Sequence, residues 1–470
     1  MDDSLHFSLA PGARLGKPSP GRLALLGARV EIPLDDRSPA VVGLIRKLAA
    51  GRVSEAELVR ASAAAGSAAA AELSYCLLLL AEEGLLCRTL VAAGAPMLTS
   101  VPLAAGDDAE RRPFQPRASY TLSRFAYCRR DGGRFVLECP LSRAQILLHD
   151  WRGVALVAAL ARPRRLAGLR KAVPGLSASG ARLAAELLWE ADALARVEGS
   201  DGTVENGRAT LAPWEFHDLL FHSRSRQGRH SAGYGQTNRL TRLVKPLPAV
   251  KPAMSREVVH LAKPEIAAVE AADWPLTRAL EQRHSERRHG ERPITLRQLG
   301  EFLYRSARAR KAVVRQGEEF TERVYPGAGS AYELEFYLVV HRSADLAAGM
   351  YHYQPLEHRL YRLAAKPEET ERLLESAART AGSAKPQVLI VAAARFARIM
   401  RRYESIGYAL ILKNVGAVFQ TMYLVATAMG LAACALGGGD SDVFARAAGT
   451  DYYAETSVGE FMLGSVPASD

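Results

Sequence analysis

The sequence predicts an α+β protein with more than one domain, and three observations lead to this expectation. The chain has 470 residues, which is too many for one ordinary hydrophobic core, so two or three domains are expected. Hydrophobic residues make up 48% of it and charged residues 24%, the composition of a soluble globular protein. Segments patterned as helices and segments patterned as strands both occur along the chain.

The overall charge and the cysteines limit the class of protein further. A formal net charge of +11 favours an anionic partner, such as nucleic acid, a phosphate-bearing cofactor or an acidic peptide, or else is only a solvated surface. The five cysteines form no Cys-x-x-Cys pair, so each is expected to be a small buried residue, outside any zinc site or disulfide framework. Acidic residues at positions 2 and 3 do not fit a secretory signal, so a cytoplasmic location is expected.

Two stretches of the N-terminal half resemble each other at a spacing of about 110 residues. Residues 31–34 recur as residues 138–141, both with the pattern Glu-x-Pro-Leu. In each copy a short strand should precede a helix, over 39–49 and 143–160, followed by a shorter helix, a longer helix and a closing strand. This is the order of a winged helix-turn-helix unit, so two such units are expected, over 1–105 and 115–210.

A winged helix often binds DNA, but the first unit offers a poor set of residues for that purpose. The helix expected near residues 54–65 carries Glu55, Glu57, Arg60 and many alanines, which is a poor set for contacts to phosphates and base edges. The same fold can bind an extended peptide by strand addition at its wing, and we favour this use. Nucleic acid is therefore not expected as a partner.

Residues 211–268 are expected to connect the N-terminal units to a last domain over 269–470. Prolines at 246, 248 and 252 predict a stiff, extended linker. His217 and His222 lie five residues apart, a spacing that does not match a pair of metal ligands on one helix face. No metal site is expected.

A long helix, a strand and a glycine turn are expected between Tyr408 and Asp440. Apolar residues cover most of the circumference of the helix over 408–429, which indicates a buried helix, and its central Lys413, Asn414 and Gln420 disfavour a membrane span. Gly430 should end the helix, a strand should follow over 431–436, and three glycines would then let a ligand approach the backbone. A cofactor cradle and a buried interface helix followed by a glycine turn fit this pattern about equally well.

Two further segments carry candidate binding residues. Arg283, Ser285 and Arg287 could bind one anion, because guanidinium groups form bidentate bonds to phosphate and a hydroxyl adds a donor. The small residues at 326–329, ahead of a strand over 334–340, would let a flat ring lie against the backbone. A surface arginine cluster and an ordinary turn are the alternatives.

The order of these motifs resembles the SagB/ThcOx branch of the nitroreductase superfamily. The motifs that carry the resemblance are Arg283-His284-Ser285-x-Arg287, Tyr325-Pro326-x-Ala328-Gly329, Arg402-Tyr403, the helix with its glycine turn, and Ser457 to Gly464. Members of this branch are FMN-dependent peptide azoline dehydrogenases. The resemblance implies a nitroreductase-like FMN domain, with a mixed sheet flanked by helices and an interdigitated homodimer, preceded by two winged-helix units that act as a peptide clamp.

The resemblance also implies partners, a reaction and binding residues. The substrate would be a thiazoline or oxazoline in a precursor peptide prepared by a cyclodehydratase, which loses a proton to a base and a hydride to the flavin. No membrane partner is implied. The residues that would bind FMN are Arg283, His284, Ser285, Arg287, Pro326, Gly327, Ala328, Gly329, Leu436, Gly437 and Gly438.

The proton-handling pair of the family departs from its usual form in this chain. Family members often carry Lys-Tyr, where this chain has Arg402-Tyr403. A guanidinium cannot act as a general base at neutral pH, so Tyr403 is the candidate base, with Arg402 favouring its phenolate or orienting the substrate. The alternative is that Arg402 pairs with Glu404 or another acid and that Tyr403 only packs.

Two other functions remain open on the sequence alone. The chain could be a flavin oxidoreductase that acts on another peptide or on a small molecule, because the superfamily fold does not determine the substrate. It could also be a catalytically inactive peptide-binding scaffold or a DNA-binding regulator that has kept the fold.

Overall fold

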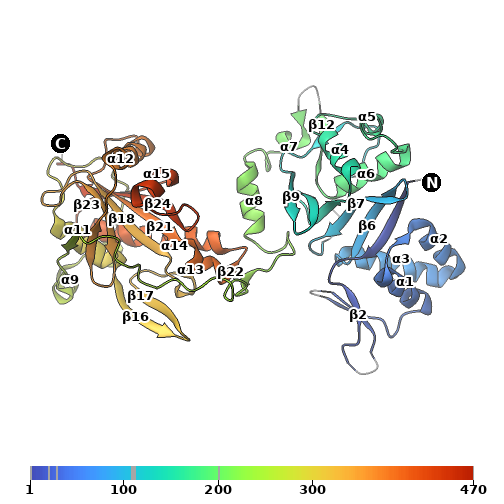
Figure 1. Cartoon of the computed structure of the whole chain (residues 1–470), viewed down its shortest axis with the longest axis horizontal. Helices are drawn as coiled ribbons and strands as arrows, with labels where there is room; N and C mark the ends of the chain where they lie inside the picture. Colours follow the sequence, from blue (N-terminus) through green and yellow to red (C-terminus); the bar gives the residue numbers. More distant parts are fainter. Residues whose placement is uncertain (1–2, 20–21, 28–29, 107–112, 199–201, 469–470) are drawn as a thin grey trace. The chain divides into compact units, whose positions relative to one another are not determined.

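The computed structural model describes residues 3–19, 22–27, 30–106, 113–198 and 202–468. The acidic residue at position 2, which entered the expectation of location, lies outside these ranges. The chain divides into two compact units, residues 1–232 and 233–470 (Figure 1). Each unit combines helices with antiparallel strands, so the expected α+β class is confirmed.

The first part of unit 1 has the element order expected of the first repeat. Ser54 caps α2 in a capping box with Glu57, which ends the preceding strand and starts the helix. Three helices are followed by a hairpin, the order of a winged helix, although membership of that class stays a prediction. The elements are β1 (Ser4–Leu9), β2 (Arg14–Gly16), β3 (Ala24–Leu26), β4 (Glu31–Pro33), α1 (Pro39–Ala50), β5 (Val53–Ser54), α2 (Glu55–Ala64), α3 (Ser67–Glu82), β6 (Leu86–Ala92) and β7 (Ala95–Pro102).

The second repeat contains one strand more than the sequence predicted. The helix expected over 143–160 is wrong in its first half, because Ala144–Leu148 forms β11 and only Trp151–Ala159 forms α4. Ile146 pairs with Ser100 of β7 on one side and with Leu137 of β10 on the other. These partner strands hold residues 144–148 extended, and the Asp150 side chain then caps α4 by accepting from the Arg152 amide.

Through β11, one seven-stranded sheet runs across both repeats in the order β5-β1-β6-β7-β11-β10-β9. Strands β9 and β10 form a hairpin, since they pair across a turn that contains Gly132. Of the five cysteines, Cys128 on β9 is exposed, whereas the other four are buried as expected. The remaining elements of unit 1 are β8 (Tyr120–Leu122), β9 (Tyr127–Asp131), β10 (Arg134–Glu138), α5 (Leu166–Ala172), α6 (Ala178–Glu190), β12 (Leu194–Glu198), β13 (Gly202–Thr203), α7 (Val204–Gly207) and α8 (Phe216–Arg224).

Unit 2 is built on a seven-stranded sheet in the order β15-β20-β19-β18-β21-β24-β23. Every adjacent pair of these described strands is antiparallel, so the expectation of a mixed sheet is corrected. Hairpins join β18, β19 and β20, and β24 lies between β21 and β23, to both of which it is antiparallel. The strands are β15 (Val258–His260), β18 (Leu334–Val340), β19 (Gly349–Gln354), β20 (Arg359–Arg362), β21 (Val388–Arg395), β23 (Leu431–Leu436) and β24 (Glu455–Ser465).

Helices cover both faces of this sheet, because its strands bury alternate residues on opposite sides. Phe302, Leu338 and Met422 belong to the core beneath α11 and α14, whereas Leu374 and Val391 belong to the core beneath α12 and α15. The β16–β17 hairpin extends away from the sheet (Figure 1). The other elements are β14 (Gly235–Gln236), α9 (Ile266–Ala272), α10 (Leu276–Gln282), α11 (Leu296–Ala307), β16 (Ala309–Arg315), β17 (Glu318–Arg323), η1 (Ala328–Ser330), α12 (Pro367–Ala381), α13 (Phe396–Met400), β22 (Tyr403–Glu404), α14 (Gly407–Ala428) and α15 (Ser441–Ala448).

The long helix α14 is buried on one side only within this chain. Met422 and Val418 are fully buried, but Leu412 is 40% exposed and Gly416 and Gln420 lie on the same open side. By length and composition α14 could cross a membrane, with 39% of its apolar window buried. The sequence predicted a helix that is buried over most of its circumference. A single copy of the chain does not bury it to that extent, because the sheet and α11 cover only one face.

The segment expected to be a linker is bonded to unit 2. Arg401 Nε donates to the carbonyl of Val244 at 2.6 Å, and Arg398 Nη1 donates to that of Leu247 at 2.7 Å. Arg395 Nη1 donates to the carbonyl of Pro248 at 2.9 Å. All three arginines are buried, so residues 244–248 are held in place along this unit.

Candidate functional site

Tyr423 of α14 joins residues 283–287, called the arginine segment, to the end of β23. Its hydroxyl lies 2.8 Å from Ser285 Oγ and accepts a hydrogen bond from the Ala435 amide at 2.7 Å. The Arg283 guanidinium lies over the same ring, 5.2 Å from its centre. Residues from three separate parts of the sequence thus meet at one side chain.

The arginine segment presents positive charge that no acid within reach neutralises. Arg287 is exposed, and in the described part of the chain neither it nor Arg283 forms an ion pair. The one acid between them, Glu286, turns toward Arg288, with 3.9 Å between carboxylate and guanidinium. His284 is exposed and its Nδ1 lies 3.0 Å from the carbonyl of Gln282. An anion can reach both free guanidinium groups.

The glycine turn after β23 leaves open space beside its backbone. A Cβ added at Gly437 would meet no atom within 4 Å, and one at Gly438 would meet only Thr380, at 3.9 Å. Both glycines are exposed, and Leu436 before them is half-buried. At Gly439, by contrast, a Cβ would lie 2.0 Å from the Glu460 carboxylate. Internal packing therefore requires glycine at 439 but not at 437 or 438.

The loop at 326–329 is tied to the buried face of α14. The Ala328 amide donates to Asn414 Oδ1 at 3.1 Å, and Asn414 Nδ2 donates to Glu333 Oε1 at 2.8 Å. Glu333 is fully buried, and burial raises the pKa of its carboxyl despite the bond from Asn414. Pro326 and Gly329 remain exposed, so the loop turns one side outward.

Tyr403 and the same loop lie in contact. Gly329 has a φ of +55°, and a Cβ at that position would lie 2.2 Å from the Tyr403 hydroxyl oxygen. Two nearby residues, Ser330 and Tyr332, also have positive φ angles, which non-glycine residues rarely adopt. The absence of a side chain at Gly329 is what allows the phenol to approach this strained turn.

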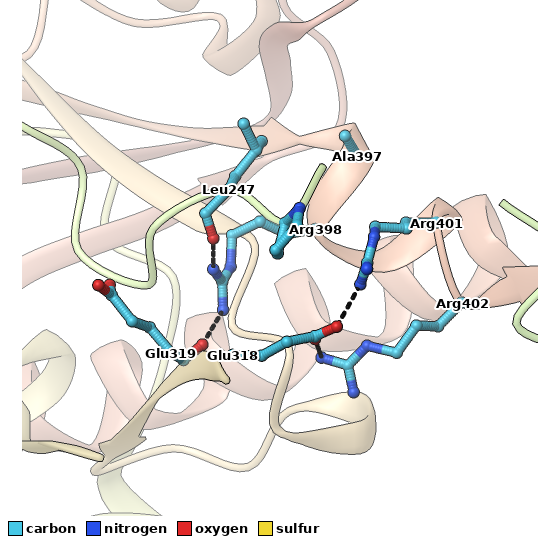
Figure 2. Close-up of a pocket in the computed structure, with 8 residues that line it drawn as sticks. Leu247, Glu318, Glu319, Ala397, Arg398, Arg401 and Arg402 are labelled. Atoms are coloured by element: carbon cyan, nitrogen blue, oxygen red, sulfur yellow. Dashed lines mark hydrogen bonds and ion pairs between the residues drawn. The ribbon is translucent and has the colours of Figure 1, made fainter. Parts of the chain in front are cut away.

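Arg402 points to a different group of residues from Tyr403. Its Nη2 lies 3.9 Å from Glu318 Oε2, and its guanidinium lies 5.0 Å from the centre of the Phe320 ring. Figure 2 shows Glu318 between Arg402 and Arg401, and Arg401 Nη1 donates to Glu318 Oε1 at 2.6 Å. The acid beside Arg402 is thus Glu318, rather than the Glu404 considered from the sequence.

Arg401, Arg402 and Glu318 line a small polar pocket, together with the segment at 246–247. Arg398 lines it too, and its guanidinium donates to the carbonyls of Leu247 and Glu319 (Figure 2). Burial lowers the pKa of Arg398 to about 10, with the nearby Arg395 acting in the same direction. The arginines of this pocket are occupied by backbone carbonyls and carboxylates, so it is a structural junction next to Tyr403.

The predicted cofactor residues fall into two groups on opposite sides of α14. Asn414 holds the loop at 326–329, and Tyr423 holds the arginine segment. Nine residues separate them on the helix, which is about two and a half turns. The structure places 283–287 beside Ala433 and Ala435, near the end of β23, and it places Gly329 against Tyr403. Among the described residues, no hydrogen bond, ion pair or ring contact joins these two groups within one chain.

Sequence reasoning missed the side chains that connect these groups. Asn414 was visible as a polar residue in an apolar helix, which is a signal of a buried hydrogen bond. Tyr423 was counted only as one more apolar residue of the helix, and no sequence feature indicates that its hydroxyl binds Ser285. Glu333 gave no signal that distinguishes it from a surface glutamate.

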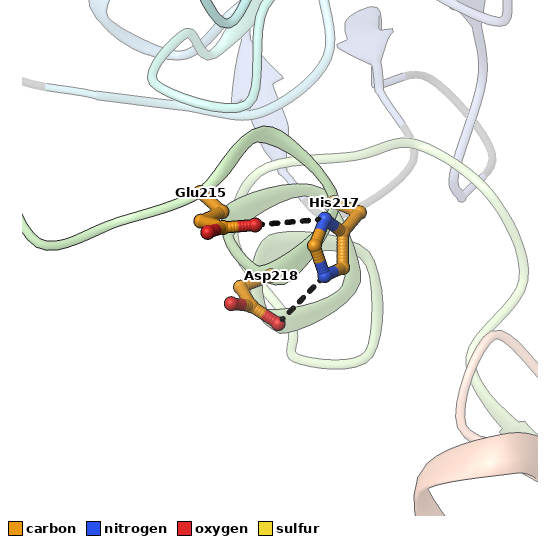
Figure 3. Close-up of side chains that lie close together, drawn as sticks. All are labelled: Glu215, His217 and Asp218. Atoms are coloured by element: carbon orange, nitrogen blue, oxygen red, sulfur yellow. Dashed lines mark ion pairs between the residues drawn. The ribbon is translucent and has the colours of Figure 1, made fainter.

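Among the residues that the structure describes, one cluster of possible metal ligands lies at the start of α8. His217 Nδ1 lies 3.7 Å from Glu215 and its Nε2 lies 3.5 Å from Asp218 (Figure 3). All three side chains are exposed, and His217 bridges the two acids itself. His222 instead packs against Trp214, with 5.4 Å between ring centres.

Two family models match the chain in separate regions. Residues 120–231 match the cyanobactin oxidase ThcOx model, and residues 280–465 match the nitroreductase family. The second region contains all the predicted cofactor and catalytic residues. The first covers the second repeat together with α8 and the loop that follows it.

Individual proteins similar to this chain include both curated and structurally solved relatives. The nitroreductase-like protein MJ1384 of Methanocaldococcus jannaschii is 29% identical over 181 residues, which are 38% of this chain and 85% of that protein. A nitroreductase-like protein of Ralstonia eutropha is 21% identical, with 48% of this chain and 96% of that chain covered, at a TM-score of 0.36. The Escherichia coli microcin synthetase McbBCD complex with truncated pro-MccB17 is 20% identical, with 45% and 85% covered, at a TM-score of 0.34.

Proposed function

Because the chain belongs to the ThcOx-type branch of the nitroreductase superfamily, we propose that it is an FMN-dependent oxidase of peptide azolines. It would convert a thiazoline or oxazoline in a ribosomally made peptide to the corresponding thiazole or oxazole. The observation that carries the proposal is the junction at Tyr423, where the arginine segment meets the end of β23. Residues proposed to hold one ligand thus share one location.

The chemistry of this location fits FMN. Arg283 and Arg287 can hold a phosphate through charge-assisted bonds, and the Ser285 hydroxyl adds a further donor. The open backbone at Gly437 and Gly438 leaves room for part of the ligand. When bound, FMN supplies the acceptor for the hydride that the azoline must lose.

Tyr403 is the residue that we propose to take the proton from the azoline carbon beside the carbonyl. Its hydroxyl lies against Gly329, in the loop that the family resemblance assigns to the flavin ring. A guanidinium cannot act as a general base at neutral pH, and Arg402 is held near Glu318, so we assign it an orienting role. The buried Asn414 fixes the loop by accepting from the Ala328 amide.

A second copy of the chain would complete the site. A ligand bound by Arg283 and Arg287 could reach Gly329 of the same chain only by passing around α14. A homodimer avoids this, because the loop of one protomer can lie against the ligand held by the other. The open side of α14, with Leu412 and Gly416, supports a dimer in which that side is covered.

Unit 1 would grip the precursor peptide, with a cyclodehydratase as the upstream enzyme of the same pathway. The match of residues 120–231 to the ThcOx model supports this assignment. The longest helix of the first repeat, α3, contains no lysine or arginine, which disfavours binding to DNA phosphates. A peptide could add to the outer edge of β9, which has no further neighbour in the described sheet.

The first test uses purified protein, its absorption spectrum and a synthetic azoline peptide. We expect flavin absorption bands, release of FMN on denaturation, and a loss of two mass units per ring oxidised, about 2 Da, with oxygen as the final acceptor. Tyr403→Phe should keep the flavin bands but lower kcat by about a hundredfold, the usual contribution of a general base. A wild-type rate in this variant would contradict the role of Tyr403.

The same measurements separate the alternative functions. Yellow protein that oxidises no azoline peptide would indicate a flavin oxidoreductase with another substrate. Colourless protein that cannot be reconstituted with FMN would indicate an inactive scaffold. Salt-dependent binding to DNA would indicate a regulator.

A further inference from the structure

We propose that Glu404 is a positioning residue, which together with residues 233–239 forms a clamp that fixes the backbone of Tyr403 beside Gly329. The inference rests on the proposed role of Tyr403 but not on the identity of the substrate. The clamp segment starts at the first residue of unit 2 and was expected from the sequence to be part of a connecting loop.

The Glu404 carboxylate is the centre of the clamp. It accepts a hydrogen bond from Thr237 Oγ1 at 2.8 Å on Oε2, and Arg239 Nε lies 3.1 Å from Oε1. A Cβ added at Gly233 would lie 2.4 Å from Oε2, so the clamp segment passes directly over the carboxylate. Three residues of one segment thus converge on one side chain.

The backbone of the clamp pairs with the backbone around Tyr403. Gly235 and Gln236 form β14, which pairs antiparallel with Glu404 and Tyr403 of β22. On either side of this pair, the Asn238 amide donates to the carbonyl of Arg402 at 3.0 Å, and Ser405 Oγ donates to the carbonyl of Gly233 at 2.8 Å. The clamp therefore spans every residue from 402 to 405.

The stretch that the clamp holds would not keep its conformation unaided. Two residues form too short a strand to be stable alone, and Ser405 has a φ of +65°, which is unfavourable for serine. On the other side the Tyr403 phenol lies against Gly329, where there is no side chain, and within the described part of the chain no hydrogen bond holds its hydroxyl. Without Glu404, the chain around Tyr403 has freedom to move, and the phenol loses its fixed place.

The first test measures backbone hydrogen exchange and requires no substrate. Glu404→Ala should speed the exchange of amides within 402–406 and 233–239 by about tenfold, because it removes one hydrogen bond and one ion pair. The matched control is Arg242→Ala, since Arg242 is exposed and has no ion pair in the described part of the chain. Unchanged exchange in Glu404→Ala would overturn the proposal.

The second test measures azoline oxidation. Glu404→Ala should lower kcat by about tenfold while the FMN content and the KM for the peptide stay at wild-type values, since the clamp acts only through Tyr403. Glu404→Gln keeps the acceptor for Thr237 but loses the charge facing Arg239. Its kcat should lie between those of the wild type and Glu404→Ala. Faster exchange combined with an unchanged kcat would overturn the positioning role.

Two further outcomes can be distinguished from a failure of the clamp: a Glu404→Ala variant that does not fold, and a wild-type protein that oxidises no azoline peptide. If Glu404→Ala does not fold, Arg239→Ala leaves the glutamate in place and should show the same effects at smaller size. If the wild-type protein binds FMN but oxidises no azoline peptide, the proposed function fails. The exchange measurement then decides the clamp alone: faster exchange supports it and unchanged exchange overturns it.

Discussion

At the scale of single residues, a glycine determines where the candidate base can lie. Gly329 has a positive φ, and a Cβ added to it would lie 2.2 Å from the Tyr403 hydroxyl oxygen. Any side chain there would push the phenol away and strain the backbone at once. The sequence indicated Gly329 as a place for a flat ring, whereas its contact with Tyr403 depends on the folded chain.

Gly329→Ala should therefore lower kcat for azoline oxidation by about tenfold or more, because it displaces Tyr403, and destabilise the protein by about 1 kcal/mol through its φ. The control is Gly382→Ala, since Gly382 has a similar φ of +64° but nothing within 4 Å of an added Cβ. The control should show the loss in unfolding free energy without the loss in kcat. Equal kcat values in both variants would contradict the contact with Tyr403.

At the scale of elements, α14 organises the candidate site. Its Asn414 holds the loop at 326–329, its Tyr423 holds the arginine segment, and its open side carries Leu412. The apolar pattern of the sequence was correct about the helix and its end at Gly430. It could not say which face the chain itself would cover, because that depends on where the sheet and α11 lie.

Leu412→Glu should convert the proposed dimer to monomers, because it places a charge on the open side of α14 that a partner would cover. Sedimentation velocity should show about half the wild-type mass, and FMN content should fall with the loss of the partner's loop. The control is Leu243→Glu, at a residue that is 79% exposed and does not belong to α14. A dimer that withstands Leu412→Glu, or a monomeric wild type, would contradict this interface.

At the scale of the whole molecule, unit 2 is held together by buried charges as well as by its two apolar cores. Glu335 is buried, and although burial raises the pKa of its carboxyl, the hydrogen bond from His352 and the charges of His352 and Arg395 bring it well below its ordinary value. A depressed pKa means that the ionised form is favoured by folding. This contribution is present above the unfolded pKa and is lost as the pH falls toward the folded pKa.

Glu335→Gln should therefore lower the free energy of unfolding by about 3–5 kcal/mol at pH 7, the effect of removing one partner from a buried charge pair. The difference from wild type should shrink at pH 3, where the wild type has lost part of the same contribution. Urea unfolding at both pH values measures this. The control is Glu322→Gln, whose carboxylate pairs with Lys311 at the surface and should have little effect.

The sequence by itself determined the elements whose signal is local. The strands at 334–340 and 431–436 were predicted with the bounds they have, because continuous apolar runs between glycines and turns indicate buried strands. The short motifs at 283–287, 325–329 and 402–403 likewise lie within a few adjacent residues. Local chemistry was enough for these features.

Tertiary structure alone decided whatever depends on partners far apart in the chain. Residues 144–148 became a strand because β7 and β10 pair with them, and the expected mixed sheet is antiparallel because β24 lies between β21 and β23 and runs against both. The meeting of Ser285 with Tyr423, and of Tyr403 with Gly329 and Glu404 with Thr237, spans tens to more than a hundred residues. Such contacts follow from the packing of whole elements, which no local pattern records.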